Sequence, residues 1–138
     1  MIELDVFGDP APQGSKRVFN GRVVEASGEK LKKWRKAIAA ECDKVTGHDI
    51  LLGPVRVEID FYLPRPATVT QKKRALPIVP PDVDKLSRAV LDGVNQGPTG
   101  KVGDGLIYGD DSQVVELYAR KFYADDRHPG ATIRISAL

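Results

Sequence analysis

The sequence contains one cysteine, Cys42, and no stretch of apolar residues that approaches the roughly 20 needed to cross a bilayer. A single cysteine excludes an internal disulfide bond, which is typical of proteins that work in a reducing cytosol. The first residues do not form a basic segment followed by an apolar one, so no secretory leader is predicted. These absences predict a soluble, cytoplasmic protein that has no membrane partner.

The 138 residues are enough for one ordinary domain that buries about two-thirds of its unfolded surface. Apolar residues alternate, or recur with helical periodicity, in most of the chain. These patterns predict strands over 1–7, 55–63, 114–123 and 132–137, helices over 27–46 and 84–95, and a tight hairpin around Asn20-Gly21. The chain is therefore predicted to be a single α+β domain that spans residues 1–138.

The formal net charge is only +2, but the charges are distributed unevenly. Residues 14–37 carry eight basic side chains against Glu25 and Glu29, and 65–74 carry four without an acid, whereas 82–126 carry nine acids and five bases. Lysine and arginine neutralise the phosphates of DNA, so a basic surface around an acidic pocket suits a nuclease. Solvated lysine faces are also common on helices, and the charge pattern alone leaves that alternative open. The residues predicted to contact DNA are Lys16, Arg17, Arg65, Lys72, Lys73, Arg74 and Lys85.

Four aspartates form the most specific pattern: Asp82 and Asp84 follow Pro80-Pro81, and Asp110 and Asp111 are adjacent. Carboxylates repel one another, so a divalent cation is the simplest reason to gather them. Mg²⁺ takes oxygen ligands and leaves several positions to water and substrate phosphate, which suits phosphodiester cleavage. If the segment after the prolines is extended, Asp82 and Asp84 point to the same side and can face one ion.

Arg88 follows Asp84 by four residues on the predicted second helix, and Asp92 follows Arg88 by four. These positions share one face of a helix, so the Arg88 guanidinium is predicted to lie beside the metal site, where it can bind the scissile phosphate. A purely structural alternative exists for each aspartate alone, because aspartate also caps helices and occupies turns.

Residues 81–94 (PDVDKLSRAVLDGV) and 109–115 (GDDSQVV) together resemble the RusA-type Holliday-junction resolvases, a family often encoded by phages and prophages. The family pattern is Asp-x-Asp-Asn/Lys-Leu-x-Lys/Arg at a helix entry, a later helical Asp, and Asp-Asp-Ser/Ala-Gln-Val entering a strand. The run from Pro10 to Arg17 also resembles the opening of many phage members. The resemblance spans almost the whole chain, and two linked motifs make it more specific than a lone Asp-x-Asp.

The resemblance implies a mixed β-sheet with two main helices packed on it. It also implies a Mg²⁺-dependent endodeoxyribonuclease that resolves four-way DNA junctions by paired cuts during recombination and repair. The family's metal-binding carboxylates fall on Asp82, Asp84 and Asp111, with Asp110 as a further candidate ligand. Its catalytic lysine falls on Arg88, which keeps the positive charge but cannot donate a proton at ordinary pH.

Further expectations concern the ion, the assembly and the location. Mn²⁺ is expected to substitute for Mg²⁺. A homodimer is expected because paired cuts in a symmetric substrate need two active sites. The cytosol would be that of a bacterium or of a phage-infected host.

Two alternatives remain. A catalytically silent DNA-binding protein of the same fold would keep the basic surface without needing all of the carboxylates. An Asp-x-Asp metal-dependent transferase also uses carboxylates and a divalent ion, but this chain is short for an added nucleotide-sugar domain. One departure from the family is the glycine-rich segment 96–107, which lengthens the link between the second helix and Asp110.

Overall fold

The computed structural model describes residues 1–14, 16–25, 28–45, 47–97, 100–101 and 103–138, with the backbone alone for 16–19 and 22–25. The elements follow the chain in the order β1 (Ile2–Phe7), β2 (Lys16–Phe19), β3 (Arg22–Glu25), α1 (Gly28–Asp43), β4 (Val55–Leu63), α2 (Val83–Val94), η1 (Asp111–Gln113), β5 (Val114–Tyr123) and β6 (Gly130–Ala137). Three strands therefore precede α1, β4 lies between the two α-helices, and two strands follow η1.

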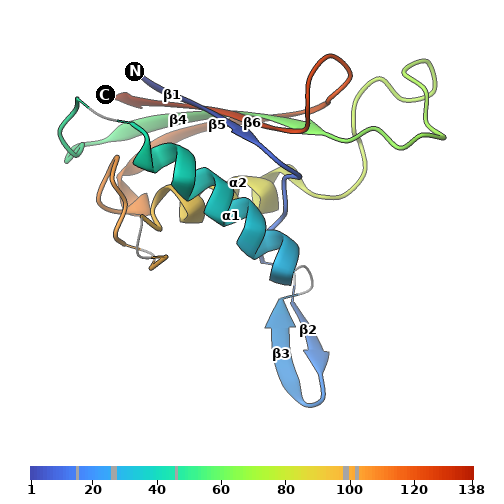
Figure 1. The fold of residues 1–138 in the computed structure, drawn as a ribbon, viewed down its shortest axis with the longest axis horizontal. Helices are drawn as coiled ribbons and strands as arrows, with labels where there is room; N and C mark the ends of the chain where they lie inside the picture. Colours follow the sequence, from blue (N-terminus) through green and yellow to red (C-terminus); the bar gives the residue numbers. More distant parts are fainter. Residues whose placement is uncertain (15, 26–27, 46, 98–99, 102) are drawn as a thin grey trace.

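The main sheet has four strands in the order β1-β6-β4-β5. It is mixed, because β6 pairs antiparallel with both β1 and β4, whereas β4 and β5 are parallel. Both α1 and α2 lie on one side of this sheet, and the two chain termini lie near each other at one end of it (Figure 1). The predicted α+β fold, with two helices packed on a mixed sheet, is confirmed.

The hydrophobic core lies between the sheet and the two helices. Along β4, Val57, Ile59 and Phe61 are at most 1% exposed, as the alternating pattern predicts for a strand with one buried face. α1 contributes Leu31, Trp34, Ile38 and Cys42, and α2 contributes Leu86, Val90 and Val94. A Cβ on Gly93 would lie 3.0 Å from Cβ of Ile38, so the glycine permits the close approach of α1 and α2.

The predicted element bounds differ from the observed ones in a few places. α1 ends at Asp43, earlier than the predicted end at residue 46, while Thr46 and the predicted cap Ser27 lie outside the described residues. β6 begins at Gly130, two residues before the predicted start. The predicted hairpin is confirmed, since Asn20 and Gly21 both have positive φ, of 49° and 76°, as a type I′ turn requires.

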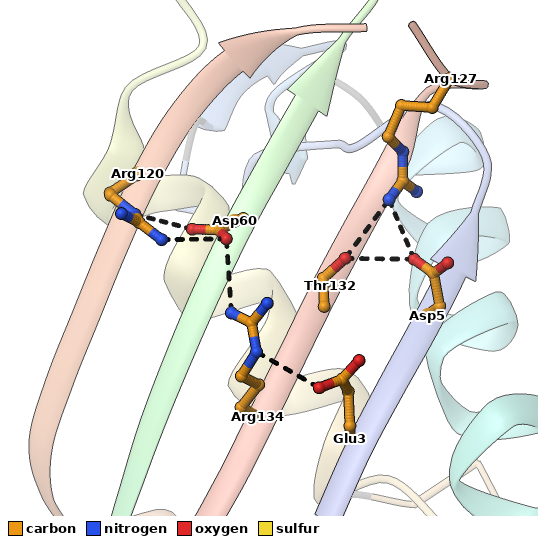
Figure 2. A network of polar contacts seen from close by, with 7 residues as sticks. All are labelled: Glu3, Asp5, Asp60, Arg120, Arg127, Thr132 and Arg134. Atoms are coloured by element: carbon orange, nitrogen blue, oxygen red, sulfur yellow. Dashed lines mark hydrogen bonds and ion pairs between the residues drawn. The ribbon is translucent and has the colours of Figure 1, made fainter.

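Charged side chains on the face of the sheet away from the helices join all four strands (Figure 2). Asp60 on β4 accepts hydrogen bonds from Arg120 on β5 at 2.8 and 3.0 Å, and from Arg134 on β6 at 3.4 Å. Arg134 also pairs with Glu3 on β1 at 3.3 Å. Asp60 is 6% exposed, so these partners offset the cost of burying its charge.

Candidate functional site

Asp82 is the residue that precedes the first turn of α2. Its backbone is extended (φ −72°, ψ 143°), and its side chain makes no capping hydrogen bond to the helix. The Lys85 ammonium lies 3.8 Å from Oδ2 of Asp82, and the Asp82 side chain is 57% exposed. The structural alternative predicted that the Asp82 carboxylate caps the helix, but it makes no capping bond and is 57% exposed, so it can accept an external cation.

Asp84 lies within the first turn of α2, because the helix begins at Val83. An extended chain through Asp84 was the condition for both carboxylates to face one ion, and it is not met: Asp82 is extended, but the helix starts at Val83, one residue earlier than predicted. Asp84 is exposed. The two carboxylates therefore stand at the N-terminal end of a helix, where unpaired N–H groups favour negative charge.

The segment before Asp82 is held against β5. The Lys121 ammonium donates hydrogen bonds of 2.9 Å to the carbonyl oxygens of Val79 and Pro81. The Pro80-Pro81 peptide bond is cis. These hydrogen bonds to main-chain carbonyls fix the end of the proline-rich segment against β5. Asp82 consequently has a defined place relative to the sheet.

Arg88 lies one turn beyond Asp84 and is exposed. The N-terminal motif passes beside it: the Gln13 amide donates a 3.0 Å hydrogen bond to the Lys85 carbonyl, and a Cβ on Gly14 would lie 3.7 Å from Nη1 of Arg88. The N-terminal run, at Gln13 and Gly14, therefore meets the 81–94 motif at the start of α2. A hollow of about 500 Å³, lined in part by Pro10, Pro12, Pro80, Lys85 and Asp82, opens at the same place.

Asp111 forms the other acidic part of the site. It accepts a 3.2 Å hydrogen bond from the hydroxyl of Tyr108. Partial burial raises the pKa of the Asp111 carboxyl to about 6; the Tyr108 hydrogen bond opposes the rise, and the neighbouring charges of Asp92 and Asp110 add to it. Asp92 on α2 therefore lies close enough to Asp111 to repel it. Such a pair of carboxylates is costly until a cation or a proton joins it.

Asp110 has a different role from Asp111. Its carboxylate accepts a 2.9 Å hydrogen bond from the Ser112 amide, while Oε1 of Gln113 accepts from the Asp110 amide at 2.9 Å. This reciprocal arrangement is a capping box at the start of η1. The hydrogen bond from Ser112 lowers the pKa of Asp110. Asp110 therefore caps a helical turn, which is the structural alternative to metal binding. Its role as a metal ligand stays a prediction.

The carboxylates fall into two groups, Asp82 with Asp84 and Asp92 with Asp111. Asp84 and Asp92 are eight residues apart on α2, which corresponds to about 12 Å along the helix axis. Within the described part of the chain, no cluster of three or more His, Cys, Asp or Glu side chains is close enough to hold one ion. Asp111 is therefore not brought together with Asp82 and Asp84 in one chain.

A divalent cation still fits the donors of each group. Mg²⁺ is bound in proteins by one or two carboxylates, with waters and substrate phosphate completing its shell. Asp82 offers an uncapped carboxylate, and Asp111 with Asp92 offers a half-buried pair whose mutual repulsion a cation would relieve. The donor chemistry of both groups suits a hard, oxygen-binding ion.

The residues predicted to contact DNA lie in two kinds of surroundings. Arg65 and Arg74 are bonded within the protein, whereas Lys72 and Lys73 are exposed. The Arg65 guanidinium pairs with Asp125 at 2.7 Å and donates to the Arg74 carbonyl at 2.5 Å, and its side chain is only 14% exposed. Arg74 donates to the Tyr123 hydroxyl at 3.1 Å. Lys72 and Lys73 are exposed, on a loop that extends beyond the end of the sheet opposite the termini (Figure 1). The Lys16 and Arg17 side chains lie outside the described part.

Two residues of the site, Tyr108 and Lys121, were not predicted from the sequence. Tyr108 is fully buried and reaches Asp111, and burial raises its own pKa. Lys121 anchors the segment before Asp82 from the C-terminal part of β5. Tyr108 could have been predicted, because it lies only three residues before Asp111 in the sequence. The contact of Lys121 with Pro81 could not, because 40 residues separate the two. The glycine-rich segment 96–107 ends in buried Ile107 and leads into Tyr108, which donates to Asp111.

Comparisons with known proteins identify the family to which this chain belongs. A family model described as endodeoxyribonuclease RusA matches residues 8–136. A Bacillus subtilis (strain 168) protein named uncharacterized protein YqaN is 31% identical over 144 residues, which cover 96% of this chain and 95% of that protein. The family match spans both acidic motifs and the run from Pro10 to Arg17.

Proposed function

Because this chain belongs to the RusA endodeoxyribonuclease family, we propose that it is a Mg²⁺-dependent nuclease that cuts four-way DNA junctions in recombination and repair. The observation that carries the proposal is the start of α2. There an uncapped Asp82, an exposed Asp84 and the Arg88 guanidinium lie within two helical turns, beside the N-terminal motif.

The carboxylates would bind the ion, and Asp82, Asp84 and Asp111 are the ligands we propose. The bound ion would position the scissile phosphate and activate water for in-line attack. Asp82 and Asp84 hold their carboxylates at a helix start fixed by Lys121, so little ordering is needed when DNA arrives. Mn²⁺ is expected to serve in place of Mg²⁺, since it accepts the same oxygen ligands.

Arg88 would stabilise the negative charge that develops on the phosphate. An arginine keeps its proton at every physiological pH, so its part is electrostatic rather than acid–base. Its exposed position at the edge of the site suits contact with a backbone phosphate.

A homodimer is the second part of the proposal. Paired cuts in opposing strands require two active sites, and twofold symmetry is the commonest assembly. The separation of Asp111 from Asp82 and Asp84 within one chain gives a further reason, because a second subunit brings a second copy of each group.

Five basic residues are proposed to bind DNA. Lys72 and Lys73 on the protruding loop, Lys85 beside Asp82, and Lys16 and Arg17 in the N-terminal motif would neutralise phosphates. Arg65 and Arg74 act indirectly, because their guanidinium groups hold the loop by bonds to Asp125, Tyr123 and main-chain oxygens.

A junction-cleavage assay tests the proposal. The purified protein would be incubated with a synthetic four-way junction, labelled on each strand in turn, with Mg²⁺, with Mn²⁺ or with EDTA. We expect symmetric nicks in opposing strands with either metal, no cuts in EDTA, and little cutting of the matched linear duplex. Metal-independent binding without cleavage would favour the catalytically silent alternative instead.

A further inference from the structure

Large apolar side chains are exposed where the segment after β4 leads into the acidic start of α2. This segment leaves the sheet at the end opposite the termini and returns to α2 (Figure 1). The exposed fraction is 53% for Leu76, 84% for Ile78, 37% for Val79 and 38% for Val83. These four residues form an apolar ridge. Contiguous exposed apolar side chains of this size mark a binding surface more often than a bare solvent face.

A buried proline fixes the tip of the apolar ridge. Pro77 is buried between exposed Leu76 and exposed Ile78. The Ile78 amide donates a 2.9 Å hydrogen bond to the Leu76 carbonyl, which closes a three-residue turn around Pro77. The middle of the turn is therefore anchored in the protein, and its two flanking side chains are left in solvent.

Hydrogen bonds to main-chain carbonyls also fix both flanks of this turn. Before it, the Arg65 guanidinium donates to the carbonyls of Arg74 and Ala75 at 2.5 and 3.4 Å. After it, the Lys121 ammonium donates to the carbonyl of Val79 at 2.9 Å. The fold thus holds the backbone of the apolar ridge in place while it leaves the side chains uncovered.

The apolar ridge and the acidic start of α2 line one hollow. Its volume is about 480 Å³, and Asp82 and Asp84 line it together with all four residues of the ridge. A phosphate held through a cation at these carboxylates would therefore bring its neighbouring bases to the ridge. Lys72 and Lys73, on the same loop, are exposed and supply positive charge for the DNA backbone.

We propose that the apolar ridge inserts between bases at the branch point of a four-way DNA junction and packs against the bases that it unstacks. This inference rests on the proposed function, because it needs DNA at Asp82 and Asp84. Apolar side chains such as isoleucine and leucine act as wedges between base steps in proteins that deform DNA. Bases that are already poorly paired cost least to separate, so a wedge favours a branch point over a continuous duplex.

A protein partner is a poorer occupant of the apolar ridge. A second subunit seated there would cover the hollow and close Asp82 and Asp84 off from the DNA that they are proposed to cut. Unstacked bases fit the surface better, because their flat faces pack on apolar side chains while the attached phosphate stays beside the carboxylates.

The fluorescence of 2-aminopurine at the branch point measures unstacking directly, because stacked neighbours quench it. In EDTA, where no strand is cut, saturating wild-type protein should raise the fluorescence about threefold or more, whereas saturating Ile78→Ser should give less than about half of that rise. Ile78→Leu keeps the apolar bulk and should match the wild type. Gel-shift titration sets the saturating concentration of each protein.

Leu138 supplies the matched control, because it is 53% exposed, as Leu76 is, and lies at the end of the sheet away from the loop. Leu138→Ser should raise the fluorescence as the wild type does. Ile78 is 84% exposed, so Ile78→Ser should melt at the wild-type temperature. Equal fluorescence with the wild type and Ile78→Ser would overturn the wedge.

A junction opened in advance separates a wedge from a structural role. In single-turnover cleavage with Mg²⁺, Ile78→Ser should cut a fully paired junction about tenfold more slowly than the wild type, since the apolar contact is lost. On a junction with unpaired bases at the branch point the two rates should agree, because no pairs remain to be separated. An equal loss of rate on both junctions would refute the wedge. So would a smaller sedimenting species for Ile78→Ser than for the wild type, which would assign the ridge to subunit contact.

The two assays also distinguish the wedge from the nuclease. A fluorescence rise that Ile78→Ser loses, without cleavage of either junction by the wild type in Mg²⁺, would reject the nuclease and leave the wedge. Wild-type rates of cleavage by Ile78→Ser on the paired junction would reject the wedge and leave the nuclease.

Discussion

The hydroxyl of buried Tyr108 donates a 3.2 Å hydrogen bond to the half-buried carboxyl of Asp111. Burial raises the pKa of Asp111 to about 6, from an ordinary value of 3.8, and Asp92 raises it further, while the Tyr108 bond partly opposes both effects. The fold thus places an acidic group where its charge is unfavourable. Such placement is characteristic of binding and catalytic sites, where function is retained at a cost in stability.

Replacing Asp111 should therefore stabilise the metal-free protein. The folded state binds its proton more tightly than the unfolded chain, so stability falls as the pH rises from about 4 to 6, and the penalty is fully present above that window. Asp111→Asn removes the penalty. In EDTA we expect its melting temperature to exceed that of the wild type by a few degrees at pH 7.5 and to match it near pH 4.

Magnesium should reverse that ranking. An ion that binds only the folded state raises the melting temperature by mass action, so Mg²⁺ should stabilise the wild type more than Asp111→Asn. Asp126→Asn, at an exposed position, is the control and should respond to Mg²⁺ as the wild type does. An identical metal response in Asp111→Asn would remove Asp111 from the ligand set.

Asp82→Asn and Asp84→Asn should each abolish junction cleavage while junction binding persists. Asparagine keeps the shape of the side chain but loses the charge that holds a cation, and less repulsion of phosphate should leave binding equal or tighter. Single-turnover cleavage and gel-shift titration measure the two effects separately. Full cleavage by either variant in Mg²⁺ would refute its assignment.

Arg88→Ala should lower the single-turnover cleavage rate by roughly 10²–10³-fold, in the range seen when one transition-state donor is lost. Arg88→Lys should retain substantial activity, because the positive charge remains. An alanine variant that cuts at the wild-type rate would exclude Arg88 from the mechanism.

The protruding lysines should determine the salt dependence of junction binding. Each phosphate contact contributes about 0.9 to the slope of log affinity against log salt, so the double variant Lys72→Ala/Lys73→Ala should lower the slope by up to about 1.8. Lys44→Ala is the control: Lys44 pairs with Glu41 at the far end of α1 and should leave the slope unchanged. An unaltered slope in the double variant would place the DNA elsewhere.

Asp60 should matter for stability rather than for cutting. Asp60→Ala would leave Arg134, which is 29% exposed, without its β4 partner, and we expect a loss of about 1–3 kcal/mol in the free energy of unfolding. Urea denaturation measures this loss, with Asp126→Ala as an exposed control. A change below about 0.5 kcal/mol would mean that water replaces the carboxylate on both arginines.

The local sequence determined most of the fold. Alternation fixed the bounds of β4 and β5 to the residue, because one face of each strand must be apolar where it meets the core. Asn20-Gly21 determined the hairpin turn, since few other pairs adopt positive φ at both positions. The sequence also located the two acidic motifs on either side of α2.

Only the tertiary structure decided how those acids are used. Asp82 and Asp110 both precede a helical turn, yet Asp110 caps its turn and Asp82 does not, because Ser112 and Gln113 complete one capping box. Asp111 lies beside Asp92 rather than Asp84, since the link through segment 96–107 returns to the second half of α2. Lys121 reaches Pro81 across 40 residues of sequence. Such long-range contacts depend on which strands pair. Strand pairing is determined by the packing of the whole hydrophobic core, so no local sequence pattern predicts it.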